Sequence, residues 1–312
     1  MIGYRVLVQL LEEGYTVRTA VRTQAGSDRI KTLKPTQPYL DRIASIIVPD
    51  NTVPGAYDEA VQGVNYIIHV ASPTPLTIPI NADIENELIQ PAMKGTISML
   101  EAAEKLNEVQ RIIITSSFVA TIGFSARGSS KIFDASKVMT LNATREWMDS
   151  HQPVFDVINI QPTVVIGRDD TVTDAKDITR GSNNFITGPL LLGSILGNGS
   201  RAWEGASVHL DDVALMHVRS LNPDIAGNQD FLATSQPPDG VEWAQVFDIV
   251  ERAYPNECAD GIFEIHTKSR PETRRLHISS AKAERAFDMK FKTFEEQVVS
   301  VVDHYLELLG RK

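Results

Sequence analysis

The sequence is poor in cysteine and in basic residues, and it has no long apolar run. Cys258 is the only cysteine among 312 residues, so one chain can build neither a disulfide framework nor a thiolate metal cluster. We expect a buried or incidental thiol. Acidic residues outnumber basic ones by 40 to 30. The net charge of −10 disfavours nucleic acids and anionic membranes as partners, because both attract a basic surface.

We expect neither a membrane span nor a signal peptide. No apolar stretch reaches the roughly 18 residues that a membrane span requires. The first residues, MIGYRVLVQLLEEG, have neither the basic start nor the cleavage site of a signal peptide. We therefore expect a cytoplasmic protein that contacts no membrane.

Strand-like and helical patterns alternate along most of the sequence, which predicts an α/β fold with a parallel sheet covered on both faces. The strand-like runs are residues 15–22, 43–48, 65–71, 111–116, 156–161 and 230–234. The helical segments are residues 3–13, 84–105, 136–149, 241–253 and 294–309. We predict a Rossmann-type core from residues 1–166 and 206–235. A smaller substrate-binding lobe would comprise 167–205 and 236–312, in one continuous globular unit.

The expected first strand of such a fold is not seen. A doubly wound nucleotide-binding sheet begins with a strand, a glycine-rich turn and a helix. Here a helical pattern follows Met1 directly, and Gly3 stands where the last glycine of the turn would be. Losing a central strand leaves buried backbone groups unpaired, at about 1–3 kcal/mol each. We hypothesise that the natural chain starts upstream; the alternative is that another segment fills the gap.

Seven short motifs, in this order and spacing, resemble the extended short-chain dehydrogenase/reductases, also called NAD(P)-dependent epimerases/dehydratases. The similarity is greatest to the branch of dihydroflavonol reductases, cinnamoyl-CoA reductases and fungal aldehyde or ketone reductases. The motifs are LLEEGYTVRTAVR at 10–22, IIHVASP at 67–73, PAMKGT at 91–96, ITSS at 114–117, ASK at 135–137, FDVINIQPTVVIG at 155–167 and VHLDDVA at 208–214.

The resemblance implies a cofactor. Arg22 ends the second strand of the family pattern, where a basic residue binds the adenosine 2′-phosphate, and Arg29 follows. Both favour NADP (NADPH) over NAD, for which an acidic residue is expected; the alternative is that both are solvated surface charges. Asp50 matches a position that contacts the adenine amine, or it forms a turn.

Further positions carry family roles. Residues at the end of a strand would pass beneath the ribose and pyrophosphate, namely Val70, Ala71 and Ser72. Pro162 and Val165 match the turn that meets the nicotinamide carboxamide. His69 is expected to pack at a strand end.

We predict no metal site. His209, Asp211 and Asp212 have suitable side chains, but the family uses this segment as a structural corner.

Reductases of this family use serine, tyrosine and lysine. The phenol gives a proton to the carbonyl oxygen, the lysine lowers the pKa of that phenol and binds the ribose, and the serine orients the oxygen. Ser117 and Lys137 match two of these residues. Phe133 stands four residues before Lys137, where the tyrosine belongs, and no tyrosine lies between residues 67 and 253. The segment between Ser117 and Phe133 is also short for the family.

Three explanations remain open for Phe133: a segment absent from the sequence, a cofactor-binding or scaffold protein without catalysis, or slow turnover with a proton from water and Ser117. We predict an NADP-dependent reductase of a hydrophobic small-molecule carbonyl, with a role in secondary metabolism, acting as a monomer or homodimer. The catalytically impaired protein is the alternative. The substrate pocket would be lined by residues 74–90, 118–132 and 167–205.

Overall fold

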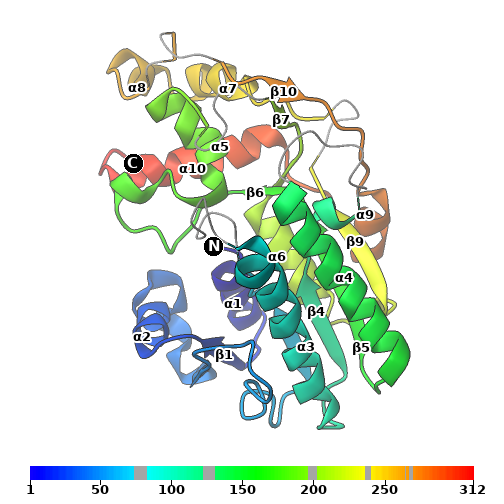
Figure 1. Cartoon of the computed structure of the whole chain (residues 1–312). Coiled ribbons are helices and arrows are strands. Elements are labelled where there is room, and N and C mark those ends of the chain that lie inside the picture. The colour runs from blue at the N-terminus through cyan, green and yellow to red at the C-terminus, as the bar shows by residue number, and fades with distance from the viewer. Residues whose placement is uncertain (74–82, 122–130, 196–201, 236–239, 264, 267–269) are drawn as a thin grey trace. The chain divides into compact units, whose positions relative to one another are not determined.

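The computed structural model describes residues 1–73, 83–121, 131–195, 202–235, 240–263, 265–266 and 270–312 (Figure 1). The chain forms two compact units, which we call the N-terminal and C-terminal units. The N-terminal unit comprises Ile2–Gln161 and Leu215–Leu232. The C-terminal unit comprises Met1, Pro162–Ala214 and Ala233–Lys312.

The N-terminal unit begins with an amphipathic helix. In α1 (Ile2–Glu12) the side chains of Leu7, Val8 and Leu11 are buried, as the apolar periodicity predicts. Gly14, with φ of +93°, ends this helix in the left-handed region where glycine is favoured. A small parallel sheet follows, formed by β1 (Val17–Val21) and β2 (Ile43–Ile47). Between these strands lie α2 (Gln24–Thr32) and a 3-10 segment, Lys34–Arg42.

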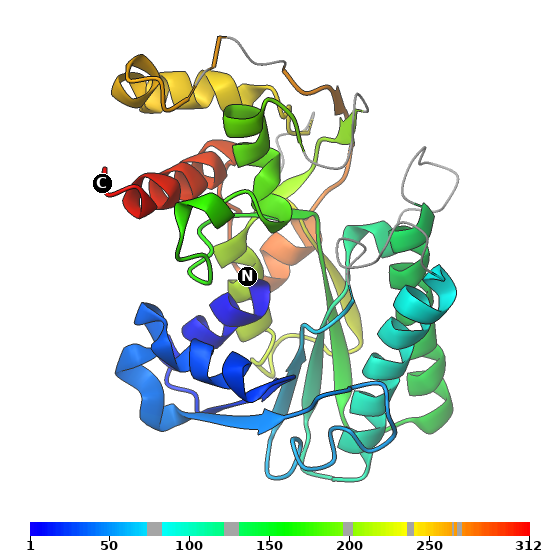
Figure 2. The ribbon, with the colours of Figure 1, turned by 60° about the vertical axis from the view of Figure 1, so that its left-hand side comes forward.

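The larger sheet has the strand order β3-β4-β5-β9, from β3 (Tyr66–His69), β4 (Arg111–Thr115), β5 (Asp156–Pro162) and β9 (Gln229–Ala233). Strands β3, β4 and β5 are parallel. Helices α3 (Gln90–Glu104) and α4 (Lys131–His151) lie on one face of this sheet (Figure 2). Their apolar side chains form one core with the strands, which includes Met99, Ile112, Trp147 and Val157. A π-helical turn, Glu85–Ile89, precedes α3, and a 3-10 turn, Phe118–Ala120, follows β4.

The two sheets of the N-terminal unit are not joined. Within the described residues, β1 and β3 are not hydrogen-bonded to each other, and no strand lies between them to join the two sheets. Residues of α1, β1 and β3 line a cavity of about 770 Å³. Ile67 and Ile68 in β3 are only half-buried, whereas every residue of β4 is buried. Among the described residues, no strand takes the place of the expected first strand between β1 and β3.

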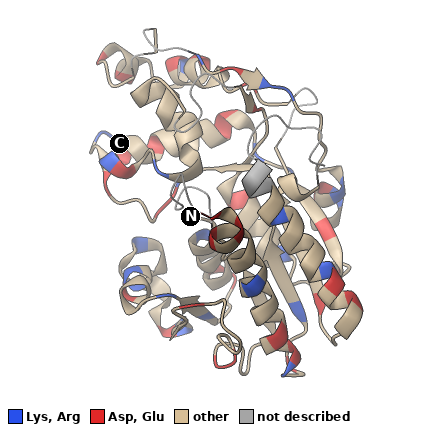
Figure 3. Ribbon diagram, viewed as in Figure 1, with Lys and Arg blue, Asp and Glu red and all other residues tan. Residues whose placement is uncertain are grey.

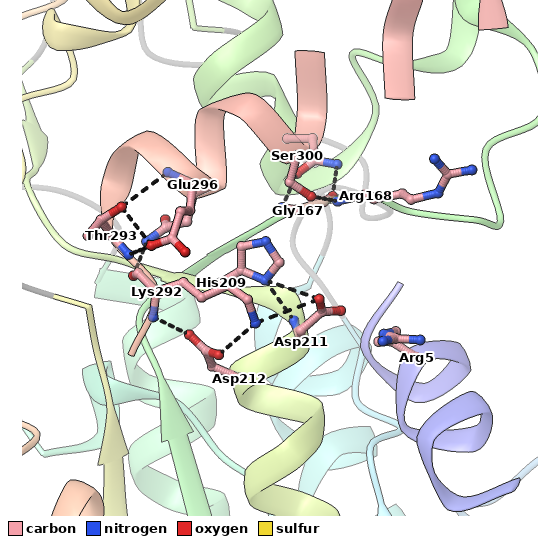
Figure 4. A network of polar contacts seen from close by, with 12 residues as sticks. Arg5, Gly167, Arg168, His209, Asp211, Asp212, Lys292, Thr293, Glu296 and Ser300 are labelled. Carbon is pink, nitrogen blue, oxygen red and sulfur yellow. Dashed lines mark hydrogen bonds and ion pairs between the residues drawn. The ribbon is translucent and has the colours of Figure 1, made fainter. Parts of the chain in front are cut away.

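The C-terminal unit has its own apolar core. Trp243, Phe247 and Val250 from the α7 region pack with Val298 and Val302 of α10. The helices α7 (Gln245–Ala253) and α10 (Phe294–Leu308) match two predicted helical segments. Thr293 and Glu296 form a capping box at the start of α10 (Figure 4).

Short elements complete this unit. They are β6 (Val164–Ile166), β8 (Ser207–His209), β7 (Trp203–Glu204), β10 (Thr273–Arg274), α5 (Asn184–Thr187), α8 (Pro255–Ala259), α9 (Ala281–Phe287), and the turns Ala175–Asp177, Gly181–Asn183 and Gly188–Leu192. Helix α6 (Leu210–Arg219) passes from the C-terminal into the N-terminal unit. No helix within the described ranges is long and apolar enough to cross a membrane.

Candidate active site

Lys137 lies in α4, one helical turn after position 133. Its side chain is half-buried, and desolvation of the amine lowers its pKa from 10.5 to about 8. Phe133 is in the first turn of the same helix, but its side chain is outside the described structure. The spacing of four residues that the sequence predicts between these positions is therefore a helical one.

Lys137 lines a small cavity at the carboxyl ends of two parallel strands. Ala71 and Ser72 follow β3, while Thr115 and Ser116 stand at the end of β4. In open α/β sheets ligands bind beyond the carboxyl ends of the strands. The cavity encloses about 10 Å³, which is close to the space that one water molecule needs. This cavity brings Lys137 together with Ala71 and Ser72, two of the three residues in the predicted segment 70–72.

His69 is the last residue of β3 and also lines this cavity. Burial, and then the positive charge of Lys137, lower its pKa to about 4, so the imidazole is neutral near pH 7. The Nε2 atom is buried and has no hydrogen-bond partner within the described residues. The ring lies edge-on to Tyr57, with 6.2 Å between centroids. His69 is packed at a strand end, as expected, and it is also a polar group of the cavity wall.

Ser117 is buried and begins the short turn after β4. Its Oγ accepts a hydrogen bond from the Val119 backbone N–H at 3.4 Å. The neighbouring Ser116, rather than Ser117, is among the residues that line the cavity. Sequence reasoning missed Ser116 because the motif contains two adjacent serines, and the motif alone does not say which of them lines the cavity.

The predicted adenosine-phosphate residues lie at the ends of β1 and α2. Arg22 directly follows β1, Arg29 is in the last turn of α2, and both are exposed. Lys and Arg residues recur along β1, α2 and the following turn (Figure 3). Asp50 accepts hydrogen bonds from the hydroxyl and the backbone N–H of Thr52, at 2.7 and 2.8 Å. These bonds, and the nearby Arg22, lower the pKa of Asp50. The turn-forming alternative for Asp50 is thus observed.

Gly3 lies in the first turn of α1 and close to the end of β3. A methyl group at Gly3 would lie 3.7 Å from Cβ of Val70, an ordinary contact. The start of α1 therefore adjoins the segment that contains Val70, Ala71 and Ser72. These two predicted cofactor segments meet in the N-terminal unit.

The remaining predicted cofactor residues belong to the C-terminal unit. Pro162 is the last residue of β5. Val165 is buried in β6 and pairs with Val208 of β8.

The acidic segment after β8 forms hydrogen bonds with residues of the C-terminal unit (Figure 4). Asp212 accepts hydrogen bonds from the backbone N–H and the ammonium of Lys292, at 2.7 and 3.2 Å. The Asp211 backbone N–H donates to Nδ1 of His209 at 3.0 Å. No group of three or more metal-binding side chains occurs in the described parts of the chain. These contacts support the structural interpretation of the segment.

Comparison with known proteins agrees with this architecture. The sequence profile of the NAD dependent epimerase/dehydratase family matches residues 1–231. A ketoreductase of Cercospora nicotianae is 34% identical over 334 aligned positions, covering 98% of this chain and 92% of the relative. An NAD-dependent epimerase/dehydratase of Alternaria alternata is 33% identical and covers 96% and 93%. The 334 positions exceed the 312 residues of this chain, so the ketoreductase has residues without a counterpart here.

Solved structures show the same fold. Gre2 from Candida albicans in complex with NADPH has a TM-score of 0.78 at 22% identity, covering 98% of this chain and 96% of that one. Vestitone reductase from alfalfa has a TM-score of 0.72 at 20% identity, covering 100% and 96%. The predicted Rossmann-type α/β fold is thereby confirmed.

Proposed function

Because this chain belongs to the NAD-dependent epimerase/dehydratase family, we propose that it is an NADP-dependent reductase of a carbonyl in a hydrophobic small molecule. The observation that carries the proposal is the desolvated Lys137 in a cavity at the carboxyl ends of β3 and β4. The names of the relatives, which include ketoreductases, support carbonyl reduction. They also support a substrate from secondary metabolism, such as the tetraketide α-pyrone in the name of one plant reductase.

The residues of the N-terminal unit fit a phosphorylated dinucleotide. Arg22 and Arg29 are exposed cations at the end of β1 and in α2, and a guanidinium group suits a 2′-phosphate. No carboxylate directly follows β1, where an NAD site would use one to bind the ribose hydroxyls. Asp50 is already engaged by Thr52. These features support NADP over NAD.

The chain's own groups then have defined tasks. The Lys137 ammonium would hydrogen-bond the hydroxyls of the nicotinamide ribose. Ser117, or its neighbour Ser116 on the cavity wall, would donate a hydrogen bond to the carbonyl oxygen and polarise it. When bound, reduced nicotinamide supplies the hydride that reaches the carbonyl carbon.

A fluorescence titration tests this proposal. We expect NADPH to bind at micromolar concentration, and NADH to bind at least tenfold more weakly. We also expect NADPH consumption with hydrophobic ketones or aldehydes. Absence of NADPH binding at tens of micromolar would contradict the proposal. Binding without turnover of any carbonyl would instead indicate a protein that binds the cofactor and does not catalyse.

A further inference from the structure

The cavity beside Lys137 contains few groups that can exchange a proton. Its described lining residues include serines, threonines and Asn159, and the titratable side chains among these described residues are His69 and Lys137. No tyrosine or carboxylate occurs among the lining residues that the structure describes. The family's usual proton donor is absent at position 133, where the side chain is a phenylalanine. The proton that completes carbonyl reduction must come from another group.

His69 does not meet this need. With a pKa of about 4, its imidazole is neutral near pH 7 and carries no acidic proton. The serine and threonine hydroxyls can donate hydrogen bonds but remain protonated near neutral pH. Among the lining residues that the structure describes, Lys137 is therefore the one that is cationic near pH 7 and able to lose a proton.

We propose that Lys137 itself donates the proton to the carbonyl oxygen, in place of the phenol that position 133 does not carry. This inference rests on the proposed function and goes beyond it, because it changes the lysine from a group that assists the acid into the acid. Lys137 lines the cavity together with Ser72 and Ser116, at the carboxyl ends of β3 and β4.

The step balances in atoms and charge. The hydride forms the new C–H bond, and the π electron pair of the carbonyl moves onto oxygen. One N–H bond of the Lys137 ammonium breaks as the O–H bond of the alcohol forms, leaving a neutral amine. The amine then takes a proton from water. The cavity has room for about one water molecule, and the unpartnered Nε2 of His69 would be among its hydrogen-bond partners.

The surroundings suit this role. Burial lowers the pKa of Lys137 to about 8, so the ammonium is a far stronger acid than an ordinary lysine. Charged side chains on the helical segments packed against α4, which include Glu85, Glu87 and Lys94, are exposed to solvent. His69 is the titratable group that faces Lys137 from β3, and it stays neutral above pH 4.

The decisive variant is Lys137→Arg, made both in the natural chain and in Phe133→Tyr. Arginine keeps a cation and hydrogen-bond donors for the ribose, but it does not lose its proton in proteins. With Phe133, we expect Lys137→Arg to lower turnover by about 10²–10⁴-fold, the usual effect of removing a general acid. NADPH affinity should stay nearly unchanged. With Tyr at 133, the same substitution should cost far less, because the phenol provides the proton.

Two further measurements complete the test. Turnover of the natural chain should fall as pH rises through about 8. In the unloaded protein, the ¹³Cε resonance that Lys137→Arg removes should titrate near pH 8. An equal loss in both backgrounds, a Lys137 pKa near 10.5, or activity only after Phe133→Tyr would each overturn the inference and leave the proposed function standing. If no variant binds NADPH, the proposed function itself fails.

Discussion

Lys137 and His69 line the same small cavity, and burial together with the charge of Lys137 lowers the pKa of the His69 imidazole to about 4. One residue comes from a helix and the other from a strand end 68 positions earlier in the chain. Near pH 7 the imidazole is therefore neutral, chiefly because it is buried, while most of the Lys137 side chains are still charged at a pKa of about 8. This difference in protonation has consequences for stability as well as for chemistry.

The stability of the protein should depend on His69 in mild acid. The folded-state pKa of about 4 lies below the ordinary 6.5, so the unfolded chain binds a proton first as pH falls. The contribution of neutral, buried His69 to the unfolding free energy is fully present above pH 6.5 and is lost as the pH falls from 6.5 through 4. Between these values the natural protein should lose roughly 3 kcal/mol more unfolding free energy than His69→Leu. Urea denaturation of both proteins from pH 7 to 4 measures this, and parallel curves would refute it.

Arg22 should determine the preference between the two nicotinamide cofactors. Replacing Arg22 by Gln removes charged hydrogen bonds to the 2′-phosphate, which are worth about 1.5–3 kcal/mol. NADPH affinity should therefore fall by roughly 10- to 100-fold, with NADH affinity unchanged. Arg42→Gln is the matched control, because Arg42 stacks on Tyr39 at 4.7 Å and has no predicted cofactor role. Equal losses for both cofactors, or for both variants, would contradict the assignment.

Removing one partner of the ion pair between Arg111 and Asp156 should strongly lower the stability of the N-terminal unit. Arg111 is buried and bonds Asp156 at 2.6 and 2.8 Å, as well as the carbonyls of Ser220 and Asn222. Arg111→Leu leaves the acid and both carbonyls without this partner, and we expect a loss of about 3 kcal/mol in denaturant unfolding.

An exposed ion pair in the same unit provides the control. Lys105 and Asp58 are separated by 2.7 Å, and about half of each side chain is exposed. Lys105→Leu should cost less than about 1 kcal/mol. If the two substitutions lowered the unfolding free energy by similar amounts, the burial of Arg111 would not be what makes its ion pair important for stability.

Gly205 should tolerate no side chain. A Cβ there would lie 2.0 Å from the Val241 carbonyl oxygen and 2.6 Å from Thr273 Cγ2. The contact with Val241 is to backbone, which side-chain motion does not relieve, so Gly205→Ala should destabilise the C-terminal unit by about 1–3 kcal/mol. Gly26→Ala is the control. Gly26 lies in α2 with its nearest neighbour at 3.4 Å, so alanine there should be neutral or slightly stabilising in thermal unfolding.

Much of the fold could be read from local patterns. The β-branched runs around residues 17–21, 43–47 and 111–115 form strands as predicted, because β-branched residues favour strands. Helix α2 was not predicted, because only Ile30 and a few small residues give it an apolar side. The segment of helix α6 was predicted only as a structural corner and not as a helix, because its burial depends on neighbours that are distant in sequence.

The sequence by itself determined the family, the α/β alternation, the phenylalanine at position 133 and the spacing of four residues to Lys137. These follow from residue identity and local periodicity, which need no knowledge of distant contacts. Only the tertiary structure decided that Ser116 rather than Ser117 lines the cavity, that His69 faces Lys137, and that the amine is desolvated. The environment of a titratable group is set by side chains from separate strands and helices, and local sequence does not specify how these converge.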